Sequence, residues 1–145
     1  MSFQRILVAT DFGDCSRQAL DLAVNLAPFG AQLTLLHVWD APRYSYGNGL
    51  YLPAELVAPV EQAAIARLEQ ELTELKKRYP TAKSALRAGA AWEQVLGAAN
   101  DLRADLIVMG THGRRGLEHA LLGSVAEKVV RSARVPVLTV HARAE

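Results

Sequence analysis

One stretch of the chain, residues 109–130 (MGTHGRRGLEHALLGSVAEKVV), combines residue types that can hold a phosphate group. Gly110 ends an apolar run, and a residue without a Cβ lets a ligand approach the backbone closely. Gly113 permits a positive φ, through which successive N–H groups can converge on an anion. Gly123 would leave space in front of a helix beginning near Ser124, where free N–H groups and the helix dipole favour an anion by roughly 0.3–2 kcal/mol. This spacing suggests a phosphate cradle.

Other features of the same stretch fit either binding or a purely structural role. Ser124 and Glu127 have the spacing of a capping box, which stabilises a helix whether or not a ligand is bound. Arg114 and Arg115 could reach phosphate oxygens, but arginine pairs in loops are commonly solvated. The pattern is not a Walker loop, because no lysine follows the last glycine, and it is not the dinucleotide fingerprint either. On these residues alone, anion binding and simple turn formation are equally open.

Few other side chains have the spacing that catalysis or metal binding requires. Asp11 directly follows an apolar run and could bind a ribose or Mg²⁺, or could cap the following loop. His112 could act as a general base, but without a nucleophile beside it, hydrogen bonding to a ligand or to its loop is the simpler interpretation. Cys15, near an expected helix start, is either a reactive thiol or a small packing residue. Three further histidines lack metal-ligand spacing: His37, His119 and His141.

The composition is that of one ordinary globular domain over residues 1–145. Half of the residues are hydrophobic, which is enough for a sizeable core. The 16 basic and 15 acidic residues leave a net charge of +1, so there is no electrostatic reason to expect nucleic acid or a membrane as a partner. A single cysteine excludes an internal disulfide, and no apolar run is long enough to cross a bilayer. We therefore expect a cytoplasmic protein.

Short apolar runs alternate with helical patterns along the chain. The runs predict strands over 5–10, 32–39, 82–89, 105–110 and 135–141. The intervening periodicity predicts helices from residue 14 to a stop at Gly30, from a first turn containing Pro59 to just before Pro80, over 91–102, and over 124–133. Asp14 or Ser16 is the expected cap of the first helix, and 40–53 is expected to be a surface loop or lid.

This alternation predicts an α/β domain, in which a mostly parallel five-stranded sheet is covered by helices on both faces. In such sheets, ligands bind beyond the carboxyl ends of the strands, where the strand order reverses. Residues 109–130 begin at the carboxyl end of the fourth strand. The location therefore favours a binding role for the glycines.

The glycine spacing resembles the nucleotide-binding signature of the universal stress protein A-like family: glycine, two residues, glycine, nine residues, glycine, serine. Other segments of the chain resemble the family too, namely ILVATDFGDCSRQALDLA, GAQLTLLHV and ADLIVMGTHGRRGLEHALLGSVAEKVVRSARVPVLTV. The resemblance implies a Rossmann-like, adenine nucleotide alpha hydrolase-like fold, with five parallel strands in the order 3-2-1-4-5. In that order, Asp11 and Gly110 would face each other across one crevice.

Family members with this signature bind ATP or a related adenine nucleotide such as AMP or ADP. Carried over by position, the resemblance implies that Ala9, Thr10 and Asp11 line the ribose and adenine side. Asp11, by the type of its side chain, could also hold the Mg²⁺ of Mg-ATP. The backbone of Val38 would meet the adenine. The residues implied to surround the ribose and phosphates are Met109, Gly110, His112, Gly113, Arg114, Gly123, Ser124 and Val125.

The sequence departs from the family in two places. Residues 40–53 have no family pattern, so a lid or accessory role is open there. The segment RAGAAWEQ lacks the proline or acidic residue that often stands two places after its glycine. The second departure concerns local geometry and leaves the expected nucleotide site intact.

The resemblance also implies a homodimer, formed by antiparallel pairing of the apolar edge strand 135–141 with its symmetry mate. The leading interpretation is a regulatory module that binds ATP and reports stress or energy status to a downstream partner. A slow Mg²⁺-dependent ATP hydrolase or phosphotransferase, using Asp11 with His112 or the arginines, is the alternative. A nucleotide-free interaction protein is a third hypothesis, against which the glycines weigh.

Overall fold

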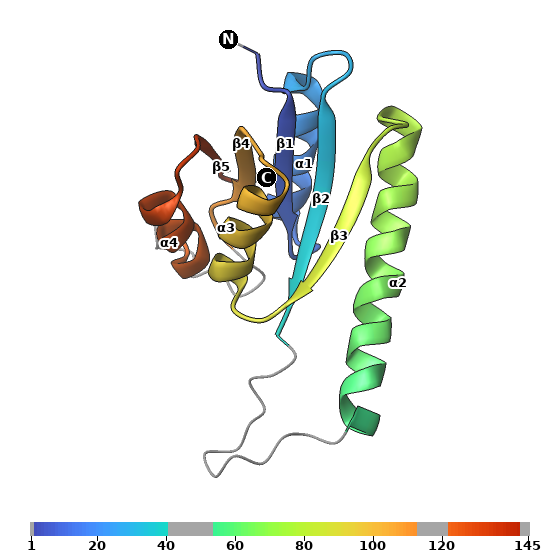
Figure 1. The fold of residues 1–145 in the computed structure, drawn as a ribbon. Helices are drawn as coiled ribbons and strands as arrows, with labels where there is room; N and C mark the ends of the chain where they lie inside the picture. The colour runs from blue at the N-terminus through green and yellow to red at the C-terminus, as the bar shows by residue number, and fades with distance from the viewer. Residues whose placement is uncertain (1, 41–53, 113–121, 143–145) are drawn as a thin grey trace.

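The computed structural model describes residues 2–40, 54–112 and 122–142, in which strands and helices alternate (Figure 1). The strands are β1 (Arg5–Thr10), β2 (Gln32–Trp39), β3 (Lys83–Ala88), β4 (Leu106–Gly110) and β5 (Val137–Val140). The helices are α1 (Asp14–Leu26), α2 (Ala54–Arg78), α3 (Ala91–Asp101) and α4 (Ser124–Ser132). Each expected strand and helix is present. The last strand is shorter than the expected 135–141, because it begins only after Pro136, which has no N–H to add to a ladder.

The strands form one five-stranded parallel sheet in the order β3-β2-β1-β4-β5. This is the order that the family resemblance implies. β1 lies at the centre, where Ile6 pairs with Leu33 of β2 on one side and with Leu106 of β4 on the other. The strand order reverses between β1 and β4. The carboxyl ends of these two strands, at Thr10 and Gly110, therefore lie at the place where such sheets bind ligands.

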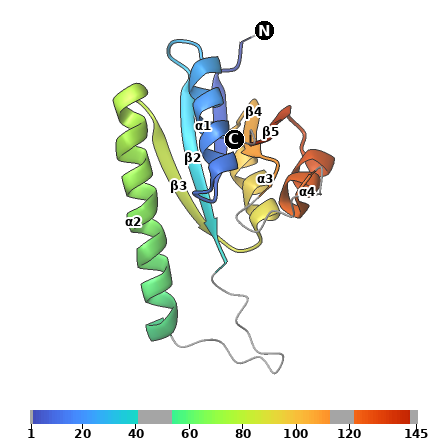
Figure 2. The same cartoon turned by 180° about the vertical axis from the view of Figure 1, so that it is seen from behind.

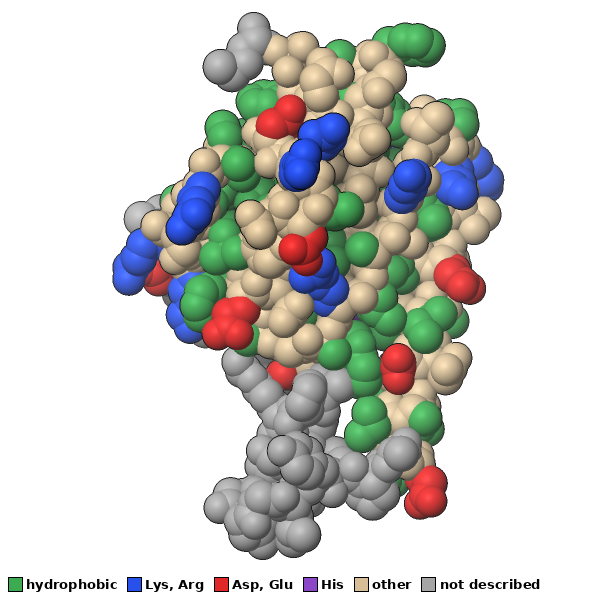
Figure 3. All heavy atoms as spheres, viewed as in Figure 1, with side chains coloured by type: hydrophobic (Ala, Val, Ile, Leu, Met, Phe, Trp, Pro, Cys, Tyr) green, Lys and Arg blue, Asp and Glu red, His purple; other side chains and the backbone are tan. Residues whose placement is uncertain are grey.

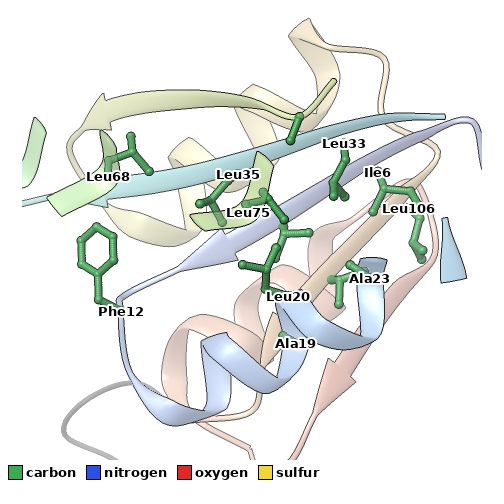
Figure 4. Packing of buried hydrophobic residues seen from close by; sticks show 13 residues of the cluster. Ile6, Phe12, Ala19, Leu20, Ala23, Leu33, Leu35, Leu68, Leu75 and Leu106 are labelled. Atoms are coloured by element: carbon green, nitrogen blue, oxygen red, sulfur yellow. The ribbon is translucent and has the colours of Figure 1, made fainter. Parts of the chain in front are cut away.

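Alternate strand residues supply two apolar cores, one on each face of the sheet. α1 and α2 cover one face, where Leu20 and Leu75 pack with Ile6 (Figures 2 and 4). α3 and α4 cover the other face, where Leu7 is buried against Val95 and its neighbours (Figure 1). Consecutive residues such as Ile6 and Leu7 point to opposite faces because side chains alternate along a strand. Burial on both faces explains why the strands are almost continuous apolar runs.

Both ends of α1 differ from the sequence expectation. Its N-cap is Gly13, without a side-chain cap, so neither Asp14 nor Ser16 fills that role. The helix ends at Leu26, before the expected stop at Gly30. Proline disfavours the helical conformation in the residue before it, so Pro28 ends the helix early. Gly30, with φ of +85°, instead forms the turn into β2.

The start of α2 also differs, because Pro59 lies inside the helix and not in its first turn. The helix begins at Ala54, which leaves the carbonyl of Glu55 without the N–H that would normally bond to it from position 59. Glu55 and Pro59 are both exposed, so water can reach that carbonyl. Solvent access explains how this helix accommodates a proline beyond its first turn.

Charged side chains of both signs are interspersed over the face that carries α3 and α4 (Figure 3). None of the helices within residues 2–40, 54–112 and 122–142 is both long and apolar enough to cross a membrane.

Candidate functional site

A cavity of about 500 Å³ lies at the carboxyl ends of β1, β2 and β4, against the first turns of α3 and α4. This is the point at which the strand order reverses. The lining residues are Ala9, Thr10, Asp11, Ser16, Leu36, Val38, Ala91, Val95, Met109, Gly110, Thr111, His112, Leu122, Gly123, Ser124, Val125, Ala126 and Glu127. Five separate stretches of the described sequence thus meet around one space.

The structure brings the expected site residues together, as far as it describes them. Those that line this cavity are Ala9, Thr10, Asp11, Val38, Met109, Gly110, His112, Gly123, Ser124 and Val125. Gly113 and Arg114 lie outside the described residues, as does the expected loop at 40–53. The cavity thus has the location that the crevice between Asp11 and Gly110 requires.

Sequence reasoning missed much of the apolar wall, which includes Leu36, Ala91 and Val95. Leu36 lies two residues before Val38 and so shares its face of β2. Ala91 and Val95 are one turn apart on α3. These periodicities are visible in the sequence, but they do not tell which helix covers which strand. The other lining residues not expected as ligand contacts are Ser16, Thr111, Leu122, Ala126 and Glu127.

Asp11 is held by its own loop and by the first turn of α1. Its Oδ1 accepts hydrogen bonds from Ser16 Oγ at 2.6 Å and from Gly13 N at 2.9 Å. Ser16 Oγ also accepts the Asp11 N–H at 3.1 Å, and Ser16 is buried. Ser16 therefore orients Asp11 and does not cap α1. In the described parts of the chain, no cluster of three or more His, Cys, Asp or Glu side chains is arranged to hold a metal ion.

Gly110 and Gly123 lack side chains because other parts of the protein come close to them. A Cβ at Gly110 would lie 2.5 Å from the Cβ of Cys15 on α1. A Cβ at Gly123 would lie 2.8 Å from the carbonyl oxygen of Thr111, which accepts the Gly123 N–H at 2.6 Å. On the side where a Cβ of residue 123 would point, the expected open space is therefore occupied by the backbone of Thr111. At both positions the glycine is required by the protein's own packing.

The helices around the cavity begin without side-chain caps. The N-caps of α3 and α4 are Ala90 and Gly123, both in extended conformations, and neither makes a side-chain capping bond. The expected capping box is wrong: Ser124 is the first helical residue, and Glu127 N donates to Gly123 O at 2.9 Å. The helix begins one residue earlier than a Ser124 cap would require, because the Gly123 N–H already donates to Thr111 O. First-turn N–H groups, which lack partners within their own helix, thus start beside the cavity.

On the opposite face of the sheet, a stack of rings supports the loop after β1. Phe12 is buried with φ of +66°, a backbone conformation that residues other than glycine rarely adopt. Its ring lies 4.3 Å from that of His37 between centroids, and the Arg67 guanidinium lies 5.2 Å above it. His37 Nδ1 donates to Thr10 O at 2.8 Å, and Phe12 N donates to Thr10 Oγ1 at 3.0 Å. These contacts fasten the cavity-lining residues Thr10 and Asp11 to β2 and α2.

Comparison with known proteins agrees with this architecture. The model of the Usp, or universal stress protein, family matches residues 2–141. The chain belongs to the universal stress protein family. The universal stress protein MJ0531 of Methanocaldococcus jannaschii is 33% identical over 142 residues, which cover 95% of this chain and 82% of that relative.

Solved structures of universal stress proteins and related chains share the fold. The hypothetical protein MJ0577 of Methanocaldococcus jannaschii has a TM-score of 0.83 and 26% identity, with complete coverage of both chains. A universal stress protein in complex with cAMP has a TM-score of 0.70 and 27% identity, covering 99% of this chain and 100% of its own. The five-stranded order 3-2-1-4-5 is thus the fold of this family.

Proposed function

We propose that this universal stress protein binds an adenine nucleotide, ATP in the first place, as a regulatory ligand in a stress or energy response. The observation that carries the proposal is the cavity at the reversal of strand order, which combines an apolar wall with the uncapped start of α4. An apolar wall suits a purine base, and free N–H groups at a helix start suit phosphates. The cAMP complex of a related protein supports the same class of ligand.

The lining residues fit this ligand by their chemistry. Leu36, Val38 and Val95 offer apolar surface to a base, and the backbone of Val38 would supply its hydrogen bonds. Asp11 would accept from ribose hydroxyls, and Ser124 and Val125 would donate N–H groups to the phosphates. ATP would supply the negative charge that this helix start can stabilise. We expect Gly113 and Arg114 to extend the phosphate contacts.

The first test examines protein purified without added nucleotide. After denaturation, any released nucleotide is identified by chromatography, and the emptied protein is then titrated with ATP, AMP and adenosine by calorimetry. Co-purified adenine nucleotide, or micromolar ATP binding, supports the proposal. If the protein releases no nucleotide and gives no heat with any of the three, the proposal fails.

A sharper test alters one N–H group at the start of α4. Proline suits the first helical position, and the extended backbone of Gly123 suits the residue before a proline. Ser124→Pro should therefore leave stability nearly unchanged while removing an N–H from the phosphate site. We expect about a tenfold loss of ATP affinity, the loss of one charge-assisted hydrogen bond. Ser124→Ala, which keeps the N–H, is the matched control. Equal affinities for the two variants would contradict the placement of the phosphates.

Regulatory binding is favoured over catalysis by the surroundings of Asp11. Its Oδ1 already accepts hydrogen bonds from Gly13 N and from Ser16 Oγ at the start of α1, which suits a positioned ribose acceptor better than a metal-held catalytic group. Mg²⁺ would then arrive with the nucleotide. Steady Mg²⁺-dependent release of phosphate by the unaltered protein, abolished in Asp11→Ala, would instead support the hydrolase or phosphotransferase alternative.

We propose further that the protein is a homodimer joined through β5 (Val137–Val140), which has β4 as its neighbour on one side. Antiparallel pairing with a second copy would cover the exposed edge of both sheets at once. A cytoplasmic location is proposed with it. Sedimentation of the unaltered protein and of Thr139→Pro tests this dimer.

A further inference from the structure

Thr111, the first residue after β4, is a buried residue whose hydroxyl joins two imidazole rings. It is 6% exposed, and its Oγ1 lies 3.0 Å from His112 Nδ1 and 3.0 Å from His141 Nδ1. The two rings meet edge to face, with centroids 5.4 Å apart. His112 lines the cavity, whereas His141 follows β5 and is not among the lining residues. One hydroxyl therefore links the cavity wall to the end of the edge strand.

The backbone of Thr111 makes a second set of links between the same elements. Its N–H donates to Val140 O at 2.9 Å, and its carbonyl accepts the Gly123 N–H at 2.6 Å. Gly123 is the N-cap of α4, the helix proposed to meet the phosphates. Thr111 thus connects the end of β5, the start of α4 and the cavity wall at His112.

The hydroxyl also restricts the protonation pattern of the two rings. A threonine hydroxyl carries one hydrogen, so it can donate to only one of the two Nδ1 atoms. At least one of His112 and His141 must therefore carry a hydrogen on Nδ1 and donate it to Thr111 Oγ1. Removing either Thr111 Oγ1 or the His141 ring would lift this restriction. The His112 ring could then change its tautomer and its orientation.

We propose that Thr111 and His141 are positioning residues for the phosphate end of the cavity. Thr111 holds His112 and the start of α4 in place, and His141 acts from outside the cavity through the Thr111 hydroxyl. The proposal rests on the proposed binding of an adenine nucleotide. It assigns to His141 an influence on phosphate binding that its place after β5 would not suggest.

The test compares ATP with adenosine, which lacks phosphates. Thr111→Val removes the hydroxyl with little change of shape, and His141→Ala removes the second ring. Both should weaken ATP binding by about 3- to 10-fold, the effect of one lost hydrogen bond, and leave adenosine binding within about twofold. In His141→Asn, a side-chain amide can replace Nδ1, so most of the ATP affinity should return. Thr73→Val, at an exposed threonine bonded to Glu69 O on α2, is the matched control.

The outcomes separate this inference from the proposed function. If the unaltered protein binds neither ATP nor adenosine, the proposed function fails. NMR of the ring nitrogens then still shows whether Thr111→Val changes the tautomers of His112 and His141. If the unaltered protein binds ATP, but Thr111→Val and His141→Ala keep its ATP-to-adenosine affinity ratio, the inference is overturned. Should Thr111→Val fail to fold, the exposed His141 decides: equal ATP affinity in the Ala and Asn variants overturns the role of the hydrogen bond.

Discussion

At the scale of single residues, Gly110 joins the cavity wall to the packing of α1. The Cβ that any other residue would place there lies 2.5 Å from the Cβ and 3.0 Å from the carbonyl carbon of Cys15. The overlap involves the Cβ and backbone of Cys15 and does not depend on its sulfur. The thiol can therefore be changed without relieving the contact, which makes the packing explanation testable apart from any ligand.

Gly110→Ala should lower the free energy of unfolding by about 1–3 kcal/mol, because α1 must move away from β4 to admit a methyl group. Urea denaturation measures this, and the loss should be the same in a Cys15→Ala background. Gly97→Ala is the control: its Cβ would meet the end of the flexible Arg87 side chain at 3.2 Å, and alanine favours a helix by up to about 1 kcal/mol. Equal stabilities for Gly110→Ala and the unaltered protein would refute the packing requirement.

At the scale of elements, α2 offers a prediction that involves no ligand. Pro59→Ala would restore an N–H to the carbonyl of Glu55 inside this helix. An interior proline costs about 3 kcal/mol, but solvent at this exposed turn and the stiffer unfolded chain that proline gives both reduce the gain. We expect a net stabilisation of about 1 kcal/mol, seen as a higher thermal midpoint. Pro80→Ala, after the helix, should give no such increase, and a lower midpoint for Pro59→Ala would contradict the argument.

The elements themselves could be predicted from the sequence, but their ends and contacts could not. Apolar periodicity located each strand and helix because Leu7, Val95 and their neighbours must face a core. The sequence does not reveal the cap of α4, because Ser124 satisfies the local pattern while a non-local bond from Gly123 to Thr111 determines where the helix starts. For the same reason the site expected from the sequence does not include Thr111, because its contacts are with the distant residue His141.

At the scale of the whole molecule, the backbone pattern shows which side of β5 could meet a second copy. Ile107 N donates to Pro136 O at 3.0 Å, and Thr111 N donates to Val140 O at 2.9 Å. Carbonyls of alternate residues in a strand point the same way, so the N–H and C=O of Thr139 point away from β4. A partner strand would bond to the backbone of Thr139.

Thr139→Pro removes that outward N–H and leaves the bonds between β5 and β4 in place, since an edge strand tolerates proline on its outer side. If β5 forms the proposed dimer interface, sedimentation should show a dimer for the unaltered protein and a monomer for the variant. Ser84→Pro is the control on β3, the opposite edge: Gly89 N bonds to Trp39 O, so by the same alternation the Ser84 N–H points outward. That variant should remain dimeric. A dimer that survives Thr139→Pro but not Ser84→Pro would move the interface to β3, and a monomeric unaltered protein would exclude the dimer at the concentrations tested.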